Sequence, residues 1–232
     1  MNIEVPGDAA AVAQRAAEII ASEARSTAAE SGRFVMAVSG GRTPWLMLAA
    51  LAKQDVPWRS VHVAQVDERV APAGDPDRNL THLRESLLAN APLPPEHIYA
   101  MPVESADLGA AAARYADTLQ GLAGSPPVLD LVHLGLGPDG HTASLVPNDQ
   151  ALHVGDADVA ITGIYQGRQR MTLTYPILNR ARKILWVVTG EEKREMLQRL
   201  LVGDPSIPAG RVLRDHAMIV ADTAASTPGE RR

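Results

Sequence analysis

Short apolar runs alternate along this chain with longer segments in which apolar residues recur at helical spacing. Apolar runs bounded by turn residues are typical of strands buried on both faces, whereas a 3.6-residue period predicts helices. The runs predict strands at 33–38 and 61–66, one beginning at 129, and further strands at 159–165, 171–175, 183–189 and 217–221. Helices are predicted at 9–30 (capped by Asp8), 45–53, 79–90, 106–122 and 191–201.

Strands that alternate with helices at these intervals predict an α/β fold: a mostly parallel sheet with helices on both faces. The 232 residues, 46% of them hydrophobic, are enough to bury one sizeable core. Neither a repeat nor a long linker interrupts the pattern. We therefore expect a single domain over residues 1–222 and a flexible tail over 223–232.

Composition and charge narrow the class of protein. The 22 Lys and Arg residues against 27 Asp and Glu residues give a net charge of −5, which argues against nucleic-acid or membrane partners. Without cysteine, disulfides and thiolate chemistry are excluded. The first residues lack the features of a signal peptide, and no apolar run approaches the roughly 18 residues of a membrane span. A cytoplasmic protein, monomeric or weakly homo-oligomeric, is expected.

Asp139 and His141 lie in a glycine-dense turn that follows the apolar run starting at Leu129. Open α/β sheets bind ligands in crevices at the carboxyl ends of their strands, where this turn is predicted to lie. An imidazole titrates near neutrality, which suits His141 to general-base catalysis. Asp139 either orients that imidazole or only bonds to the backbone of its own turn. His133, inside the predicted strand, is expected to be a core residue.

A second glycine-rich turn lies between the first predicted strand and the following helix. It consists of Ser39, Gly40, Gly41, Arg42 and Thr43, with Pro44 suited to the first helical position. Glycines, two hydroxyls and a helix N-terminus together can form a phosphate cradle. The alternative is an ordinary tight turn capped by Thr43. Because no Gly-Lys-Ser/Thr sequence ends the turn, a P-loop enzyme is not expected.

Two further groups of charged residues are candidates for the same crevice. The triplet Asp67-Glu68-Arg69 follows a predicted strand and is either part of the site or a solvated loop. Residues 168–194 hold seven basic and two acidic residues, a local charge of +5. That concentration suggests an anionic small ligand, with Arg170 and Lys193 as the best candidates. Lys193, in the first turn of a predicted helix, opposes the helix dipole and therefore needs another reason for its position.

Taken together, these segments resemble the 6-phosphogluconolactonases, within a larger group that includes the glucosamine-6-phosphate deaminases. The segments that carry the resemblance are 38–44, 66–69, 77–79, 135–147, 170–174, 179–181 and 189–193. The resemblance implies a modified Rossmann-like sheet and hydrolysis of 6-phospho-D-glucono-1,5-lactone to 6-phospho-D-gluconate in the oxidative pentose phosphate pathway. It also implies a phosphorylated sugar lactone as the small-molecule partner, with no cofactor and no metal.

The resemblance further implies roles for particular residues. The turn Ser39–Thr43, Arg170 and Lys193 would hold the phosphate. The sugar side would be lined by Asp67, Arg69 and Asn79, and His141 would be the base, with Asp139 as its possible partner.

Three alternatives compete with this interpretation. In the deaminases, the segment that corresponds to 139–147 resembles Asp-Gly-His-x-Ala-Phe-Asn-Glu-Pro. The position of the glutamate that partners their histidine is occupied by Val146 in this chain. A dinucleotide site formally matches Gly135, Gly137 and Gly140, but no clear amphipathic helix follows them. A non-catalytic sugar-phosphate sensor would need an output module, for which the chain has no spare length, and would have little use for His141.

Overall fold

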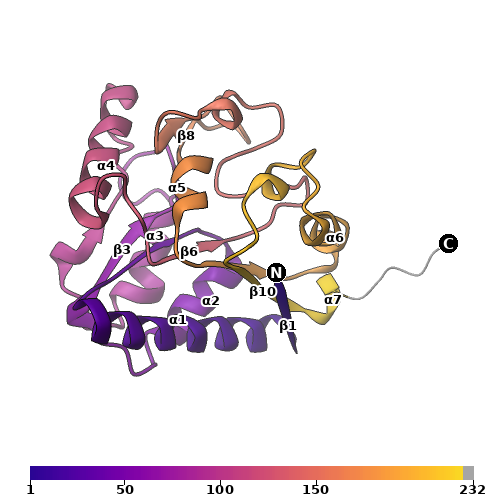
Figure 1. Cartoon of the computed structure of the whole chain (residues 1–232). Helices are drawn as coiled ribbons and strands as arrows, with labels where there is room; N and C mark the ends of the chain where they lie inside the picture. The colour runs from indigo at the N-terminus through magenta and orange to yellow at the C-terminus, as the bar shows by residue number, and fades with distance from the viewer. Residues whose placement is uncertain (227–232) are drawn as a thin grey trace.

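The computed structural model describes residues 1–226, in which seven strands form one parallel sheet (Figure 1). Across the sheet their order is β1 (Asn2–Gly7), β10 (Ala217–Asp222), β9 (Ile184–Val188), β6 (Leu131–Leu134), β2 (Phe34–Val38), β3 (Val61–Gln65) and β5 (Ile98–Tyr99). The helices are α1 (Ala9–Ser31), α2 (Arg42–Leu51), α3 (Asn79–Leu83), α4 (Leu108–Ala123), α5 (Tyr175–Arg180), α6 (Arg194–Val202) and α7 (Thr223–Ser226). Within residues 1–226, no helix has the length and apolar character to cross a bilayer.

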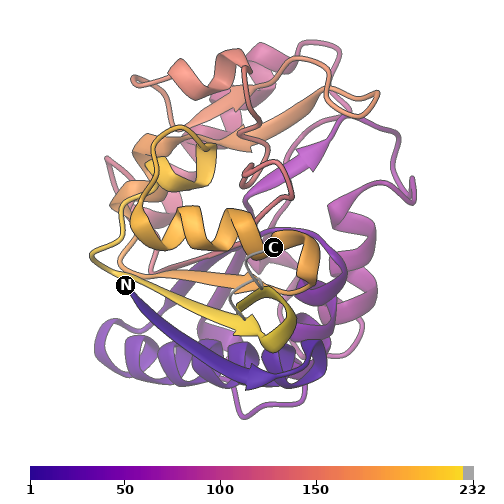
Figure 2. The same cartoon turned by 90° about the vertical axis from the view of Figure 1, so that its right-hand side faces the viewer.

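Helices cover both faces of the sheet, which confirms the predicted fold class. Along β2, Phe34, Met36 and Val38 pack with residues of α1 and α2, while Val35 and Ala37 belong to the core on the opposite face, with α4, α5 and α6. The strand is therefore apolar at every position because neither face meets solvent. Figure 2 shows β1 beside β10 at the sheet edge, with α1 below and α6 above.

A second, antiparallel sheet was not expected from the sequence. It consists of β4 (Asp67–Arg69), β8 (Arg170–Leu173) and β7 (Val159–Ile161), in that order. Residues 67–69 are thus a strand and not the solvated loop that was the alternative; Asp67 and Glu68 are both buried. This small sheet lies beyond the carboxyl end of β3 and brings residue 69 directly opposite residue 170.

Several element boundaries differ from the sequence-based expectation. Helix α2 begins at Arg42, so Pro44 is its third residue and not its first. The helix expected at 79–90 is α3 followed by a π-helical segment, η2 (Arg84–Leu88). The helix expected from 191 starts as a 3-10 turn, η5 (Glu191–Lys193), and continues as α6. Strands β1 and β5 and helix α5 were not anticipated.

The end of the described chain is ordered further than expected. The sequence predicts a flexible tail over 223–232, yet Thr223–Ser226 forms α7 and Ala225 is buried. The Asp222 carboxylate accepts the backbone N–H of Ala225 at 2.8 Å and so fixes the start of this helix. The rest of the predicted tail, residues 227–232, lies outside the described residues.

Candidate active site

The candidate site lies where β2 and β6 end side by side. From β2 the chain continues to β3 on one side of the sheet, and the strand that follows β6 in the same sheet, β9, lies on the other side. Such a switch in direction leaves a crevice at the carboxyl ends of the strands. A cavity of about 140 Å³ occupies this place. The sequence-predicted residues that line it are Ser39, Gly40, Asp67, Arg69, Asn79, His141, Arg170 and Lys193.

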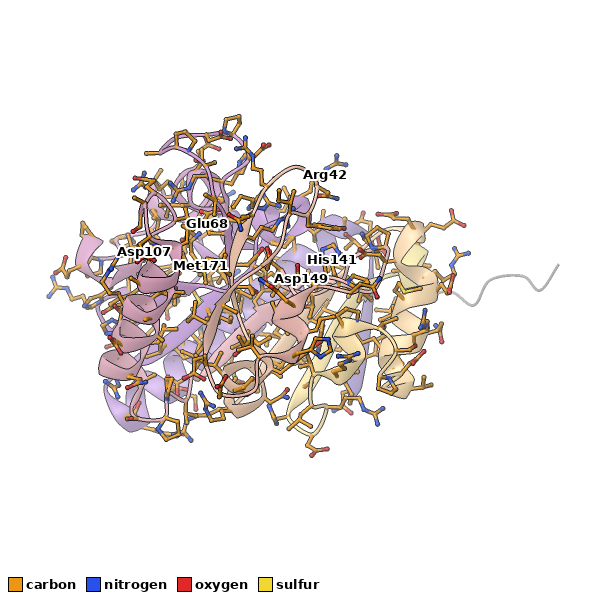
Figure 3. All side chains as sticks on the ribbon, turned by 90° about the horizontal axis from the view of Figure 1, so that it is seen from above. Arg42, Glu68, Asp107, His141, Asp149 and Met171 are labelled. Atoms are coloured by element: carbon orange, nitrogen blue, oxygen red, sulfur yellow. The ribbon has the colours of Figure 1, made fainter. Side chains whose placement is uncertain are left out.

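The rest of the first glycine-rich turn lines an adjoining, wider cavity. Gly41, Arg42 and Thr43 line this space of about 550 Å³, which shares Gly40 and Lys193 with the smaller cavity. Thr43 is buried, and its hydroxyl lies 2.6 Å from that of Thr189. Arg42 is exposed and lies apart from His141 in the view of Figure 3.

Ser39 is fixed by the neighbouring strand. Its backbone N–H donates to Nδ1 of His133 at 3.2 Å, and its hydroxyl donates to the His133 carbonyl at 3.0 Å. His133 is completely buried, and burial lowers the pKa of its imidazole to about 3. The ring is therefore neutral and can accept at Nδ1. The expectation that His133 is a core residue is confirmed.

Asp139 bonds both to the backbone of its own turn and to the imidazole of His141, the two alternatives that the sequence left open. Its Oδ1 atom accepts the backbone N–H of His141 at 3.1 Å and lies 2.6 Å from His141 Nδ1. The side-chain hydrogen bond with His141 holds the pKa of Asp139 well below its usual range. An ionised carboxylate can only accept, so Nδ1 carries the hydrogen and the lone pair of the imidazole is at Nε2.

Tyr165 is a neighbour of this pair that the sequence did not predict. The sequence predicts it as the last residue of a strand at 159–165, but β7 ends at Ile161 and Tyr165 lies in the turn between β7 and β8. Its hydroxyl donates to Oδ2 of Asp139 at 3.0 Å. Gln166 and Gly167 in the same turn have φ angles of 52° and 79°. A glycine-containing dipeptide between two strand patterns is a hairpin signal, but it does not tell which turn side chain reaches another loop.

The cationic side of the cavity is built from two arginines and a lysine. Arg69 and Arg170 face each other directly in the β4–β8 pair, an arrangement that is unfavourable for like charges. Burial, and then the charge of Arg69, lower the pKa of Arg170; burial also lowers the pKa of Lys193. Among residues 1–226, neither the Arg69 nor the Arg170 Nε atom has a hydrogen-bond partner. Cationic side chains with hydrogen-bond donors still to be satisfied suit an anionic ligand.

The opposite wall is made by Asp67 and Asn79. The Asn79 side-chain amide donates to the Asp67 carbonyl at 2.9 Å, and the Ser144 hydroxyl donates to Asp67 Oδ2 at 2.6 Å. A Cβ atom on Gly40 would lie 1.9 Å from Asn79 Oδ1, so only glycine permits this close approach. That Oδ1 atom is buried and has no partner in the described part of the chain, which leaves it free to accept from a ligand.

Glu68 positions this wall, a role that sequence reasoning missed. Its completely buried carboxylate accepts the backbone N–H groups of Asn79 at 2.7 Å, Leu80 at 2.8 Å and Arg69 at 2.8 Å. The first two of these N–H groups belong to the unsatisfied N-terminus of α3. Glu68 therefore connects β4 to α3 and fixes the backbone of Arg69 and Asn79, two of the residues that line the cavity. The only signal in the sequence is its place between Asp67 and Arg69.

Glu68→Gln is expected to lower the free energy of unfolding by about 3 kcal/mol, as breaking a buried ionic network does. The new amide group cannot accept the N–H groups that one carboxylate oxygen accepts now, and the Arg78 guanidinium, 3.4 Å from Glu68, loses its buried partner. Urea unfolding measures the change. Glu104→Gln is the control, because Glu104 pairs with the same arginine at the surface and is expected to change stability little. Equal effects of the two substitutions would contradict this role.

The carboxylates near the cavity are engaged by protein donors. Asp67 bonds to Ser144, Asp139 to His141, and Glu68 to three backbone N–H groups. In residues 1–226, no group of three histidine, aspartate or glutamate side chains is arranged to hold a metal ion.

Comparisons with known proteins give the family. Residues 7–221 match the family described as glucosamine-6-phosphate isomerases/6-phosphogluconolactonase. A 6-phosphogluconolactonase from Nostoc sp. is 37% identical over 203 residues, which cover 86% of this chain and 84% of the relative. One from Streptomyces coelicolor is 30% identical, covering 97% of this chain and 94% of the relative.

Solved structures agree with the sequence comparison. The crystal structure of 6-phosphogluconolactonase from Thermotoga maritima superposes with a TM-score of 0.85 at 26% identity, covering 95% of this chain and 98% of that one. A monomeric glucosamine-6-phosphate deaminase gives a TM-score of 0.85 at 18% identity, which shows a shared fold alone. The chain belongs to the glucosamine-6-phosphate isomerase/6-phosphogluconolactonase family.

Proposed function

We propose that this chain hydrolyses 6-phospho-D-glucono-1,5-lactone to 6-phospho-D-gluconate. The observation that carries the proposal is one cavity lined both by the Asp139-paired imidazole of His141 and by three cationic side chains, Arg69, Arg170 and Lys193. A lactone that carries a phosphate needs both an anion site and a base. The relatives named 6-phosphogluconolactonase, which match most of the chain, support the same substrate.

In the proposed binding mode, the phosphate lies at the cationic side of the cavity. Arg170, Lys193 and the backbone N–H groups of residues 40–43 hold it, the turn contributing the N-terminus of α2. The sugar hydroxyls then contact Asp67, Arg69 and Asn79. Anchoring a group remote from the reacting carbon fixes the position of the lactone carbonyl near His141.

His141 acts as the general base in this proposal. With Nδ1 bonded to Asp139, its Nε2 atom accepts a proton from a water molecule as the water oxygen attacks C1 of the lactone. The C1 carbonyl becomes a tetrahedral oxyanion. When this intermediate collapses, the C1–O5 bond breaks and the imidazolium returns its proton to the departing ring oxygen. Asp139 stabilises the imidazolium in between.

Acid release from freshly prepared 6-phosphogluconolactone tests the function. The protein is expected to accelerate acid release above the spontaneous rate, and an unchanged rate would reject the proposal. Glucosamine 6-phosphate serves as the comparison substrate. We expect no ammonia from it, because the deaminase glutamate position is held by Val146, a buried residue that cannot relay a proton.

Gly137→Ala is expected to lower kcat on the lactone by at least about tenfold, since small displacements of a catalytic group are costly. A Cβ atom at this position would lie 2.1 Å from His141 Nδ1 and 2.7 Å from Asp139 Oδ1, so the imidazole must move away from its carboxylate. Steady-state kinetics measure the effect. Gly155→Ala is the control, because its Cβ would meet no atom within 4 Å. Normal kcat in Gly137→Ala would show that the imidazole position is not critical.

A further inference from the structure

The hairpin turn between β7 and β8 reaches both functional ends of the cavity through one side chain, Tyr165. Its hydroxyl donates to Oδ2 of Asp139 at 3.0 Å, while the other oxygen of that carboxylate holds His141. The Arg170 guanidinium carbon lies 4.9 Å from the centre of the Tyr165 ring, within cation–π range. The rings of Tyr165 and His141 also meet edge to face, with centres 5.6 Å apart.

These contacts have a defined direction. Burial, and then the hydrogen bond to Asp139, raise the pKa of Tyr165, so its hydroxyl stays protonated and acts as the donor. Asp139 thus has one oxygen bonded to the imidazole and the other to the phenol. The Arg170 guanidinium contacts the aromatic ring of the same tyrosine. Its Nη2 atom also donates to the side chain of Gln166, the next residue in the hairpin turn, at 3.2 Å.

Two separate restraints follow from this arrangement. The phenol hydroxyl prevents the Asp139 carboxylate from turning away from His141, which keeps the imidazole in the tautomer with its lone pair at Nε2. The aromatic ring supports the buried Arg170 cation, which faces the like charge of Arg69 across the strand pair. The first restraint concerns the chemical step and the second concerns binding of the anion.

We infer that Tyr165 is a positioning residue for the reaction, whose hydroxyl orients the Asp139–His141 pair and whose ring holds Arg170 toward the substrate phosphate. This inference rests on the proposed function. It predicts that the two roles separate when the hydroxyl and the ring are removed one at a time.

Tyr165→Phe removes the hydroxyl and keeps the ring. We expect kcat to fall roughly three- to tenfold, the kinetic equivalent of one net hydrogen bond, while KM stays within about twofold. The acid limb of the kcat/KM profile is expected to move to higher pH, because a carboxylate that no longer receives the phenol hydrogen bond holds the imidazole proton more tightly. Tyr165→Ala removes the ring as well, and KM is then expected to rise at least about threefold in addition.

Tyr99→Phe is the matched control. It removes a tyrosine hydroxyl that bonds to His62 at the β5 edge of the sheet, and it is expected to leave kcat, KM and the pH profile unchanged. Circular dichroism verifies the fold of each variant. A Tyr165→Phe variant with the kcat and pH profile of the parent would overturn the hydroxyl's role. A Tyr165→Ala variant with the KM of Tyr165→Phe would overturn the ring's role.

Two measurements need no turnover and separate this inference from the proposed function. The Nδ1 proton resonance of His141, assigned by its loss in His141→Ala, is expected to shift in Tyr165→Phe and not in Tyr99→Phe. Titration with inorganic phosphate is expected to show weaker binding to Tyr165→Ala than to Tyr165→Phe. If the parent protein fails to hydrolyse the lactone, the function is wrong, and these two measurements still decide whether Tyr165 positions its neighbours. An unmoved resonance with equal phosphate affinity would overturn the inference.

Discussion

His141→Ala is expected to lower kcat for lactone hydrolysis by about 10²–10⁴-fold, the contribution typical of a positioned base. The substitution removes the group that takes the proton from water and leaves the cationic side of the cavity intact. KM is therefore expected to stay within a few-fold of its original value, because the phosphate contacts are unchanged. Steady-state kinetics corrected for spontaneous hydrolysis give both constants.

His153→Ala is the control for this substitution. His153 ends the 3-10 turn η4 (Gln150–His153) and is exposed, so its removal is expected to leave both constants unchanged. Turnover by His141→Ala close to that of the parent protein would remove His141 from the role of base. A large rise in KM without a fall in kcat would instead show that the imidazole binds substrate and does not activate water.

Arg170→Ala is expected to raise KM by about 10–100-fold with a smaller change in kcat, since hydrogen bonds to charged groups contribute roughly 1.5–3 kcal/mol. Arg170 is 5% exposed, and its Nε atom has no partner among residues 1–226. The phosphate it is proposed to hold is remote from the reacting carbon, so its loss weakens binding in the ground state and the transition state alike.

Arg182→Ala is the control for the loss of a positive charge. The Arg182 side chain is 70% exposed and pairs with Asp130 at the surface, so only a minor change in KM is expected. Unchanged KM in Arg170→Ala would refute its assignment to the phosphate. A fall in kcat with constant KM would move Arg170 to the reacting end of the substrate.

The central strands could be predicted from the sequence because burial on both faces leaves them apolar at every position. This holds for β2 and β9, and β6 departs from it only at His133, which is itself completely buried. The turns that follow β2 and β6 contain residues that line the cavity. The edge strand β1 was missed since most of its residues are exposed, so its apolar pattern is weak. Pairing with β10 defines this strand, and pairing partners are not visible in a local pattern.

In the small antiparallel sheet, β7 and β8 overlap predicted strands, but β4 was missed for a different reason. Asp67 and Glu68 are charged and would ordinarily be solvated, yet both are buried. Their burial is offset by hydrogen bonds from Ser144 and from the N-terminus of α3, which are distant in the sequence. Tyr165 was missed on the same grounds, because its contact with Asp139 joins two loops that no spacing relates.

A crystal structure with 6-phosphogluconate bound tests the central claim most directly. The account predicts one product molecule across the cavity, with its phosphate against Arg170 and Lys193 and its C1 carboxylate within hydrogen-bond reach, about 3 Å, of His141 Nε2. A phosphate at the imidazole, or a product molecule bound away from this cavity, would contradict it.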